Sequence, residues 1–312
     1  MKKKQKIKTP LEVMQTFTLK NIPDLDVCVL AALELFSQEK IPKVSIPYKK
    51  PLVVGSGNAA ATGKIIFEKS DAVFADESTV DAKLKNIKAI DGVVLISASG
   101  GKHAPIIAKK AKKLKKKVTL ITNNPRSEAA MLSDKTYLFP KNREPYTYNT
   151  STYLGMVLGQ TKEDPQKIMH FIKNRIDQLT FPDFKRFKKY YFLVPEEFTG
   201  VIRLLNVKFI ELFGRNVARD IETFEYLKHA TTVVPSDELF IAFGKKMDPL
   251  FGKNSLFIPL PKNADYAAMM AISYYIVGKI QKAQPAWFKQ NIESYMKKAS
   301  KAFGKIMSPI VE

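Results

Sequence analysis

The chain has 312 residues, of which 45% are hydrophobic and 26% are charged, as in packed proteins with one large or two modest domains. This composition excludes a disordered, collagenous or disulfide-rich chain. The single cysteine, Cys28, excludes an internal disulfide and a cysteine metal cluster. We therefore expect a cytoplasmic protein with neither a secretion signal nor a membrane span, since the longest apolar run, residues 266–278, is too short for a bilayer.

The net charge is +21, from 51 basic and 30 acidic residues, and only seven of the basic residues are arginine. Such a charge predicts anionic partners. Proteins that bind nucleic acid favour arginine and place aromatic side chains among their cations. The lysine run at residues 109–115 contains no aromatic residues between the lysines. We therefore expect no nucleic-acid partner. RNA binding stays an alternative that a steep salt dependence would reveal.

Residues 1–50 predict an N-terminal helical segment, and residues 24–39 carry its clearest helix. Apolar side chains recur there at helical spacing, and two prolines, Pro42 and Pro47, end the pattern. The apolar positions are Leu25, Val29, Ala32, Leu33 and Phe36.

Residues 51–160 predict the first of two α/β domains. Short, continuously apolar segments alternate here with helical ones, which is typical of a parallel sheet covered on both faces. The helix expected at residues 102–115 would bury Ile106, Ile107, Ala111 and Leu114 and turn its lysines outward. The four expected strands lie at residues 52–54, 72–75, 93–96 and 118–121.

A helical connector is expected at residues 161–188, and a second, shorter α/β domain at residues 189–284. Its segment 265–279 is apolar nearly all round, which predicts a central helix. Residues 285–312 predict a helical tail. The fold class is therefore α/β, with two parallel-sheet α/β/α units in tandem and helices at both ends. The strands of the second domain are expected at residues 190–194, 239–243 and 256–258, with a helix at 197–213.

The segment 95–102 is the most specific local pattern in the chain. A buried strand ends there in Ser97, Ser99, Gly100 and Gly101 directly before a helix. Such a turn directs backbone N–H groups, a helix N-terminus and two hydroxyl groups at one place, so it can hold a phosphate group, and Lys102 would add a positive charge. The alternative is an ordinary strand-to-helix turn with a serine cap.

A second glycine-rich turn, Gly55-Ser56-Gly57-Asn58, follows the first expected strand in the same way. It departs from the dinucleotide fingerprint because Ala60 stands in place of the third glycine, and only Asp76 supplies an acid after the next strand. We therefore include the four residues among the phosphate-binding candidates and keep a nucleotide site as the weaker alternative.

Three segments together resemble the sugar isomerase (SIS) domain family. In that family the S-x-S-G loop binds the phosphate of a phosphosugar, so the resemblance implies this role for Ser97 and Ser99. It also implies that both α/β units are of the SIS type. The second unit lacks such a loop, so one phosphate site per chain is expected. The segments are Gly55-Ser56-Gly57, Ile96-Ser97-Ala98-Ser99-Gly100, and Ile121-Thr122-Asn123-Asn124 with Ser127 and Ala130.

The likeness extends over residues 50–285 to double-SIS proteins, such as the isomerase portion of glucosamine-6-phosphate synthases. It implies that Glu211 moves a proton between sugar carbons C1 and C2. It also implies that His229 opens the sugar ring in the pocket of a neighbouring subunit, so a homodimer or larger homo-oligomer is expected. A glutamate and a histidine suit this chemistry. The alternatives are a surface ion pair of Glu211 with Lys208 and a structural role for His229. The matching segments are Val207-Lys208-Phe209-Ile210-Glu211 and Glu225-Tyr226-Leu227-Lys228-His229.

A polar cluster at the end of the first domain closes over the sugar in SIS enzymes, and the resemblance places Glu144, Ser151 and Thr152 there. A capping box around Asn149 is the alternative interpretation of these residues.

Together these residues predict an enzyme that processes phosphosugars, either an aldose–ketose isomerase or an aminosugar-phosphate deaminase or deglycase, with Glu211 moving the proton. A sugar phosphate is the expected ligand, and no cofactor or metal ion is expected. The alternative is a protein that binds a phosphosugar without catalysis, as a sensor.

Overall fold

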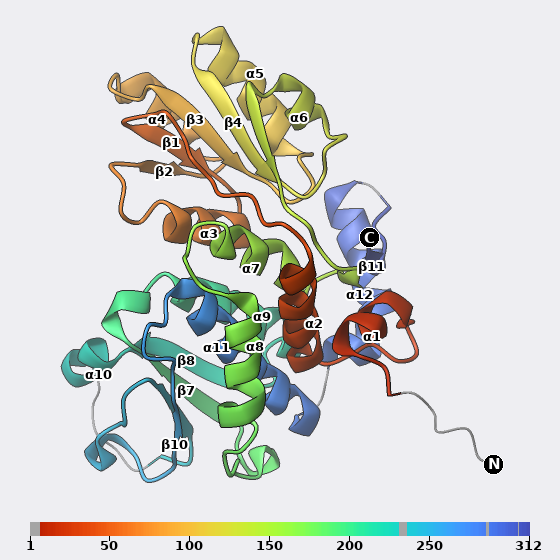
Figure 1. Cartoon of the computed structure of the whole chain (residues 1–312), viewed down its shortest axis with the longest axis vertical. Coiled ribbons are helices and arrows are strands. Elements are labelled where there is room, and N and C mark those ends of the chain that lie inside the picture. The colour runs from red at the N-terminus through yellow and green to blue at the C-terminus, as the bar shows by residue number, and fades with distance from the viewer. Residues whose placement is uncertain (1–6, 231–235, 285–286, 305) are drawn as a thin grey trace.

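The computed structural model describes residues 7–230, 236–284, 287–304 and 306–312 (Figure 1). The chain forms two parallel sheets with a layer of helices between them. The expected α/β class with two sheet-containing units is confirmed. The domain limits remain predictions, and the last of them, at residue 285, lies outside the described residues.

The first sheet has five parallel strands in the order β2-β1-β3-β4-β5. β1 and β3 are buried along their whole length, because helices cover both faces of the sheet. The four strands expected from the sequence are confirmed. β5 is not predicted, because three of its four residues are exposed and no apolar run marks it. The strands are β1 (Pro51–Val54), β2 (Val73–Ala75), β3 (Gly92–Ile96), β4 (Lys117–Thr122) and β5 (Lys135–Leu138).

The helix after β3 turns its lysines outward as expected, but its buried stripe differs from the prediction. Ile107 and Ala111 are buried, whereas Ile106 and Leu114 are each 52% exposed. The stripe follows positions 104, 107, 108 and 111, whose spacing of three and four residues keeps one face on the sheet. Leu114 lies just beyond the end of the helix. The helices of this unit are α3 (Asn58–Ile66), α4 (Val80–Asn86), α5 (His103–Lys113) and α6 (Glu128–Leu132).

The second sheet has four parallel strands in the order β10-β9-β7-β8. In the reverse direction this order is β8-β7-β9-β10. It is the same arrangement as β2-β1-β3-β4 in the first sheet, with the second strand of the unit at the edge and the first strand next to it. β8 is not predicted, since its sequence ARDIET is mostly polar and it lies at a sheet edge. The last two strands, β9 and β10, are joined by the 3₁₀ turn Pro249–Phe251 and not by a crossover helix. The strands are β7 (Lys189–Val194), β8 (Ala218–Thr223), β9 (Leu239–Phe243) and β10 (Ser255–Ile258).

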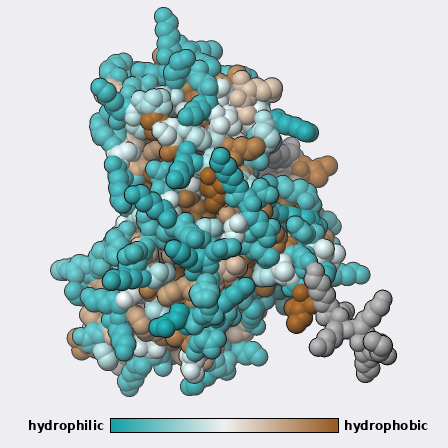
Figure 2. All heavy atoms as spheres, in the orientation of Figure 1, coloured by the Kyte–Doolittle hydropathy of each residue, from teal (hydrophilic) through white to brown (hydrophobic). Residues whose placement is uncertain are grey.

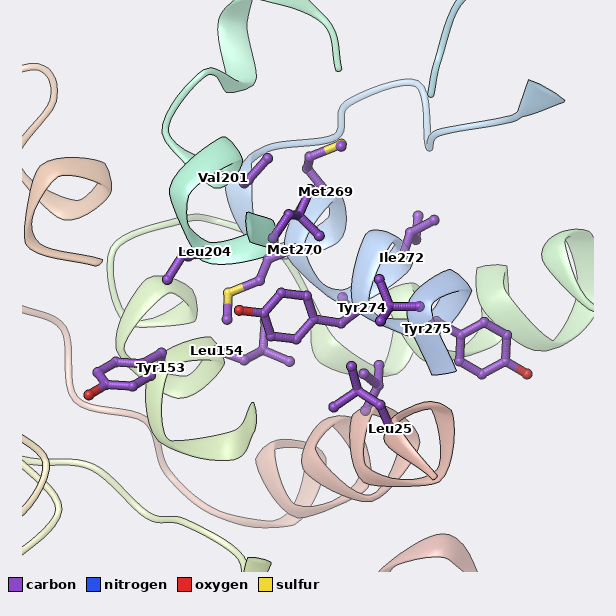
Figure 3. Close-up of a cluster of buried hydrophobic side chains, with 14 of the residues drawn as sticks. Leu25, Tyr153, Leu154, Val201, Leu204, Met269, Met270, Ile272, Tyr274 and Tyr275 are labelled. Carbon is purple, nitrogen blue, oxygen red and sulfur yellow. The ribbon is translucent and has the colours of Figure 1, made fainter. Parts of the chain in front are cut away.

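One helix, α11 (Tyr266–Ala283), forms the centre of the helical layer and confirms the expected central helix. It packs against three other helices, and nearly all of its side chains are buried. Figure 3 shows Tyr274 of α11 between Leu154 and Met270. The surrounding helices are α2 (Leu25–Gln38), α7 (Thr150–Leu158), α8 (Pro165–Phe171), α9 (Val201–Phe213) and α12 (Trp287–Phe303).

Smaller elements complete the fold. The chain near the C-terminus returns to the first unit, where β11 pairs antiparallel with β6. Hydrophilic residues cover most of the face shown in Figure 2. Within the described parts of the chain, no helix is both long and apolar enough to cross a membrane. These elements are α1 (Pro10–Thr16), β6 (Glu144–Pro145), the π-turn Ile172–Ile176, the 3₁₀ turns Phe184–Arg186 and Glu196–Phe198, α10 (Phe224–Ala230) and β11 (Ile310–Val311).

Candidate functional site

The loop after β1 brings the chain tightly into the first turn of α3. A Cβ atom on Gly55 would lie 2.7 Å from the backbone carbon of Ala59, so only glycine fits there. Gly57 has φ +56°, a conformation that also favours glycine. Ser56 is exposed and its hydroxyl donates to the carboxylate of Glu77. The Ser56 hydroxyl is therefore already engaged with a carboxylate, so Ser56 is less suited to contact an anion.

The loop after β3 is held from behind by the end of β4. Thr122 Oγ1 donates to the carbonyl oxygen of Ala98 at 3.0 Å, and Asn124 Nδ2 donates to that of Ser99 at 3.1 Å. Gly100 has φ +60°, and a Cβ atom there would lie 2.1 Å from Ser127 Oγ. The loop is therefore built around one glycine that no other residue can replace without movement.

The serine hydroxyl groups of this loop accept hydrogen bonds from its own backbone. Gly100 N–H donates to Ser97 Oγ at 3.2 Å, and Gly101 N–H donates to Ser99 Oγ at 3.3 Å. These contacts leave each hydroxyl hydrogen able to donate to an anion. Lys102, the N-cap of α5, is exposed with φ +55°. Since β1 and β3 are parallel neighbours, this loop and the loop at residues 55–58 lie at the same edge of the sheet.

An ion pair on α9 joins the buried Lys208 to Glu211. Lys208 is only 1% exposed, and its ammonium donates to Glu211 Oε2 at 3.1 Å, to the carbonyl oxygen of Thr147 at 3.0 Å and to that of Tyr148. Three acceptors satisfy all three ammonium hydrogens. The ion pair that the sequence offered as the alternative is therefore present, but its lysine is buried and its glutamate is 22% exposed.

Glu211 faces the first unit through Asn58. Burial raises the pKa of the Glu211 carboxyl, while the charge of Lys208 and the hydrogen bonds from Lys208 and Asn58 act in the opposite direction. Asn58 is 8% exposed and stands at the start of α3, one residue beyond Gly57. The structure thus brings Glu211 to the edge of the first sheet where the two candidate phosphate loops lie.

Two side-chain oxygen atoms on the first turns of α3 are buried without a partner in the described part of the chain. Asn58 Oδ1 and, one helical turn further along α3, Thr62 Oγ1 have no hydrogen-bond partner among the described residues. A buried polar atom costs stability unless it is satisfied by protein, water or a ligand. These atoms are therefore suited to accept hydrogen bonds from a bound hydroxylated molecule.

Tyrosines line the surroundings of the Lys208–Glu211 pair. The ammonium of Lys208 lies 5.3 Å from the ring centre of Tyr274. Burial raises the pKa of Tyr274 and of Tyr153, and the nearby charge of Glu211 raises both further. Tyr146 and Tyr295 are half-buried, and their rings lie 6.4 Å apart. Burial raises the pKa of the Tyr146 and Tyr295 hydroxyl groups, and the Glu211 carboxylate raises both further.

The polar cluster expected to close over the sugar caps α7 instead of opening into a pocket. The Glu144 carboxylate accepts from Thr150 N–H at 2.6 Å and from Ser151 N–H at 2.7 Å. Burial raises its pKa, and these hydrogen bonds lower it again. Ser151 is fully buried and its Oγ accepts from Asn142 N–H at 2.8 Å, and Thr152 is 4% exposed. The cap is supplied by Glu144, whereas Asn149 makes no side-chain cap bond.

His229 lies apart from this site within the chain. It is on α10, at the outer edge of the second sheet (Figure 1), with a side chain 76% exposed. Its Nε2 lies 3.0 Å from Glu225 Oε1. The charged and polar groups found near Glu211 do not include it. A contribution to a neighbouring subunit remains a prediction.

Lys208 is the residue that sequence analysis undervalued. Its position three residues before Glu211 indicates an ion pair, but burial depends on how α9 packs against the chain at Thr147 and Tyr148. The facing position of Asn58 and Glu211, 153 residues apart, likewise follows only from the packing of α3 on α9.

Solved structures with a similar fold carry the names of sugar phosphate enzymes. Glucosamine-6-phosphate deaminase from Thermotoga maritima is 19% identical with a TM-score of 0.57, over 88% of this chain and 94% of that one. Tagatose-6-phosphate ketose/aldose isomerase from Escherichia coli is 11% identical with a TM-score of 0.55, over 87% and 90%. The chain has an SIS-type fold.

The C-terminal domain of glucosamine-fructose-6-phosphate aminotransferase from Francisella tularensis shares the SIS-type fold along nearly its whole length. It is 16% identical with a TM-score of 0.53, over 93% of this chain and 98% of that one. A scan against protein families finds no match, and a search of curated proteins finds none. Similarity at these identities establishes the fold.

Proposed function

We propose that this chain is a phosphosugar-processing enzyme, an aldose–ketose isomerase or an aminosugar-phosphate deaminase or deglycase, in which Glu211 transfers a proton between C1 and C2. One observation carries the proposal: a carboxylate that is only 22% exposed, held by a buried ammonium, faces the edge of the sheet where two glycine-rich loops end. Carboxylates with a raised pKa in such places are typical of catalytic sites. The names of the structures with the same fold indicate the same substrate class.

The phosphate group would bind at the carboxyl ends of β1 and β3. Ser97 and Ser99 would donate their hydroxyl hydrogens, and the N-termini of α3 and α5 would add positive potential. Gly55, Gly57 and Gly100 allow the backbone to approach the ligand closely. This arrangement leaves the sugar carbons to extend toward Asn58 and Glu211.

Proton transfer would follow from the position of Glu211. The ionised carboxylate takes the proton from C2 of an open-chain aldose phosphate, the C–H electron pair forms the C1=C2 double bond of an enediol, and the former carbonyl oxygen at C1 gains a proton. Return of a proton from Glu211 to C1, with loss of the O2 proton, gives the ketose. The same enolisation would precede loss of ammonia from an aminosugar phosphate.

Lys208 would act as a positioning residue, since its three hydrogens are already donated to protein acceptors. It holds Glu211 in one orientation and favours its ionised form. Asn58 would donate to Glu211 and accept from a sugar hydroxyl through Oδ1. His229 would open the sugar ring of a neighbouring subunit in a homo-oligomer.

The substitution Glu211→Gln tests the proposal. We expect exchange of the C2 proton of hexose phosphates with solvent deuterium, followed by NMR, to fall by about 100-fold or more. Binding of the same ligands, followed by thermal shift, should persist. Glu293→Gln, at an exposed position of α12, is the matched control and should exchange like the wild type. Binding without any exchange in the wild type would support a sensor instead, and absence of both would refute the proposal.

A further inference from the structure

A hollow lined by α8 and the start of α11 carries more cations than carboxylates. We name it the α8 groove. It has a volume of about 1140 Å³ and lies between residues 162–175 and residues 261–268. Its five cations are all exposed. They are Lys162, Lys167, Lys173, Arg175 and Lys262.

The carboxylates in the α8 groove are already engaged as helix caps. Glu163 accepts from the N–H groups of Asp265, Ala267 and Ala268 at 2.8, 2.9 and 3.1 Å, at the start of α11. Asp164 accepts from the first N–H groups of α8, and Asp265 accepts from Tyr266 N–H at 2.8 Å. In the described part of the chain, no ion pair joins these acids to the five cations. The groove therefore has five cations against three carboxylates that are occupied with backbone donors.

The lysine-rich surface of α5 can be compared with the α8 groove. There the chain neutralises its own lysines: Lys109 pairs with Glu128 at 2.7 Å, Lys110 with Asp81 at 2.7 Å. Lys112 pairs with Asp134 at 3.4 Å. The cations of the α8 groove differ from these three α5 lysines both in lying around a hollow and in having no ion pair with an acid among the described residues.

We propose that the α8 groove binds an acidic peptide segment of a partner protein. Residues 165–176 span about 17 Å at 1.5 Å per helical residue, which matches five or six residues of extended peptide. Half-buried Met169 and Phe171 lie between the cations of the two ends and offer contact for an apolar side chain. An acidic segment with interspersed apolar residues fits a groove with cations at both ends and apolar side chains between them.

Other occupants fit the groove less well. A second copy of this chain has a net charge of +21, so its average surface does not complement the cations of the groove. Nucleic acid favours arginine and several aromatic platforms, whereas the groove has one of each, Arg175 and Phe171. A compact polyphosphate would reach only part of a hollow with cations at both ends.

Fluorescence anisotropy of a labelled peptide, Glu-Glu-Leu-Glu-Glu-Leu-Glu-Glu, tests this proposal on the full chain. We expect binding that weakens with salt and that a peptide with glutamine at every glutamate position does not reproduce. Replacing Lys167, Lys173 and Lys262 with glutamate should weaken it at least about tenfold. The control replaces three exposed lysines of the first unit, Lys85, Lys88 and Lys113, with glutamate, giving the same net charge. It should change affinity less than about twofold.

Single variants, Lys167→Gln and Lys173→Gln, keep the test decisive if a triple variant unfolds, since each removes one exposed charge and should weaken binding measurably. Equal loss in both triple variants would show unspecific attraction and overturn the proposal, as would equal binding of the glutamate and glutamine peptides. Tripolyphosphate and a mixed RNA oligonucleotide serve as competitors. The proposal would also be overturned if either displaced the peptide at a concentration below that of the peptide and itself lost binding in the groove variant.

Discussion

The two sheets share a strand order but differ in the loops at their carboxyl ends. After β1 the chain reads Gly55-Ser56-Gly57, whereas after the matching strand β7 it reads Pro195-Glu196-Glu197. After β3 come small residues and an eleven-residue helix, whereas Gly244-Lys245-Lys246 after β9 leads only to a 3₁₀ turn. Serine hydroxyls and helix N-termini favour an anion, and carboxylates repel it. A shared topology therefore provides two equivalent places, and under the proposed function only the loops of the first are suited to bind phosphate.

The largest effect is expected where the two units meet, at Lys208. The substitution Lys208→Met leaves Glu211 as a buried carboxylate without its cation and removes the donor to Thr147 and Tyr148. Breaking a buried pair costs about 3–5 kcal/mol, so the free energy of unfolding in urea should fall by that order. Lys228→Met breaks an exposed pair of the same spacing with Glu225 and should leave the urea midpoint unchanged. Similar losses in both variants would contradict the burial described for Lys208.

The second comparison uses one glycine from each unit. Gly100 and Gly244 both have positive φ, +60° and +70°, in the loops after β3 and β9. The substitution Gly100→Ala should cost about 1–3 kcal/mol of stability or more, through backbone strain and the close approach of its Cβ to Ser127, and reduce phosphosugar affinity at least about tenfold. Gly244→Ala, the control for positive φ, meets only the Leu260 side chain at 3.1 Å and should cost less stability, without loss of affinity. Loss of affinity in Gly244→Ala alone would place the ligand on the second unit.

Much of the fold could be predicted because apolar runs mark the buried strands. Such runs form the strands β1, β3, β4, β7 and β9. The helix α11 could be predicted because its sequence is apolar on nearly every side. The edge strands β5 and β8 are partly exposed and carry no such signal. Their pairing is decided by neighbours distant in the sequence.

Only the part of the candidate site that lies within a single loop could be predicted from the residues alone. The serines and Gly100 lie in a single loop, so their pattern in the sequence indicates an anion site. The burial of Lys208 and the approach of Asn58 to Glu211 depend on how α9 packs, and no local pattern records them. The role of Glu144 as the cap of α7 likewise depends on a chain reversal between β6 and the helix.

A third effect concerns pH at the contact between Asn58 of the first unit and Glu211 of the second unit. Because burial raises the pKa of Glu211, and a base must be ionised to accept a proton, kcat/KM should rise with pH through a value above the usual carboxyl pKa. The substitution Asn58→Leu removes a hydrogen bond that lowers this pKa, so the rise should move to higher pH. Glu222→Gln, on β8 of the second sheet, is the control and should not move it. A profile that Asn58→Leu leaves in place would contradict the contact between the two residues.

The smallest effect separates the phosphate loop from the general positive charge of the chain. The substitution Ser97→Ala removes one hydroxyl donor and should weaken phosphosugar binding by about 1 kcal/mol, or several-fold, in calorimetry. Lys246→Ala, which removes an exposed charge after β9, should leave the affinity unchanged. The reverse order of effects would mean that charge and not the serine loop attracts the ligand.

A crystal structure of the protein soaked in glucosamine 6-phosphate or fructose 6-phosphate tests the central claim most directly. The account predicts the phosphate between the loops at residues 55–58 and 97–101, with sugar carbons C1 and C2 next to the Glu211 carboxylate. A phosphate seated at the loops after β7 and β9, or a sugar turned away from Glu211, would contradict it.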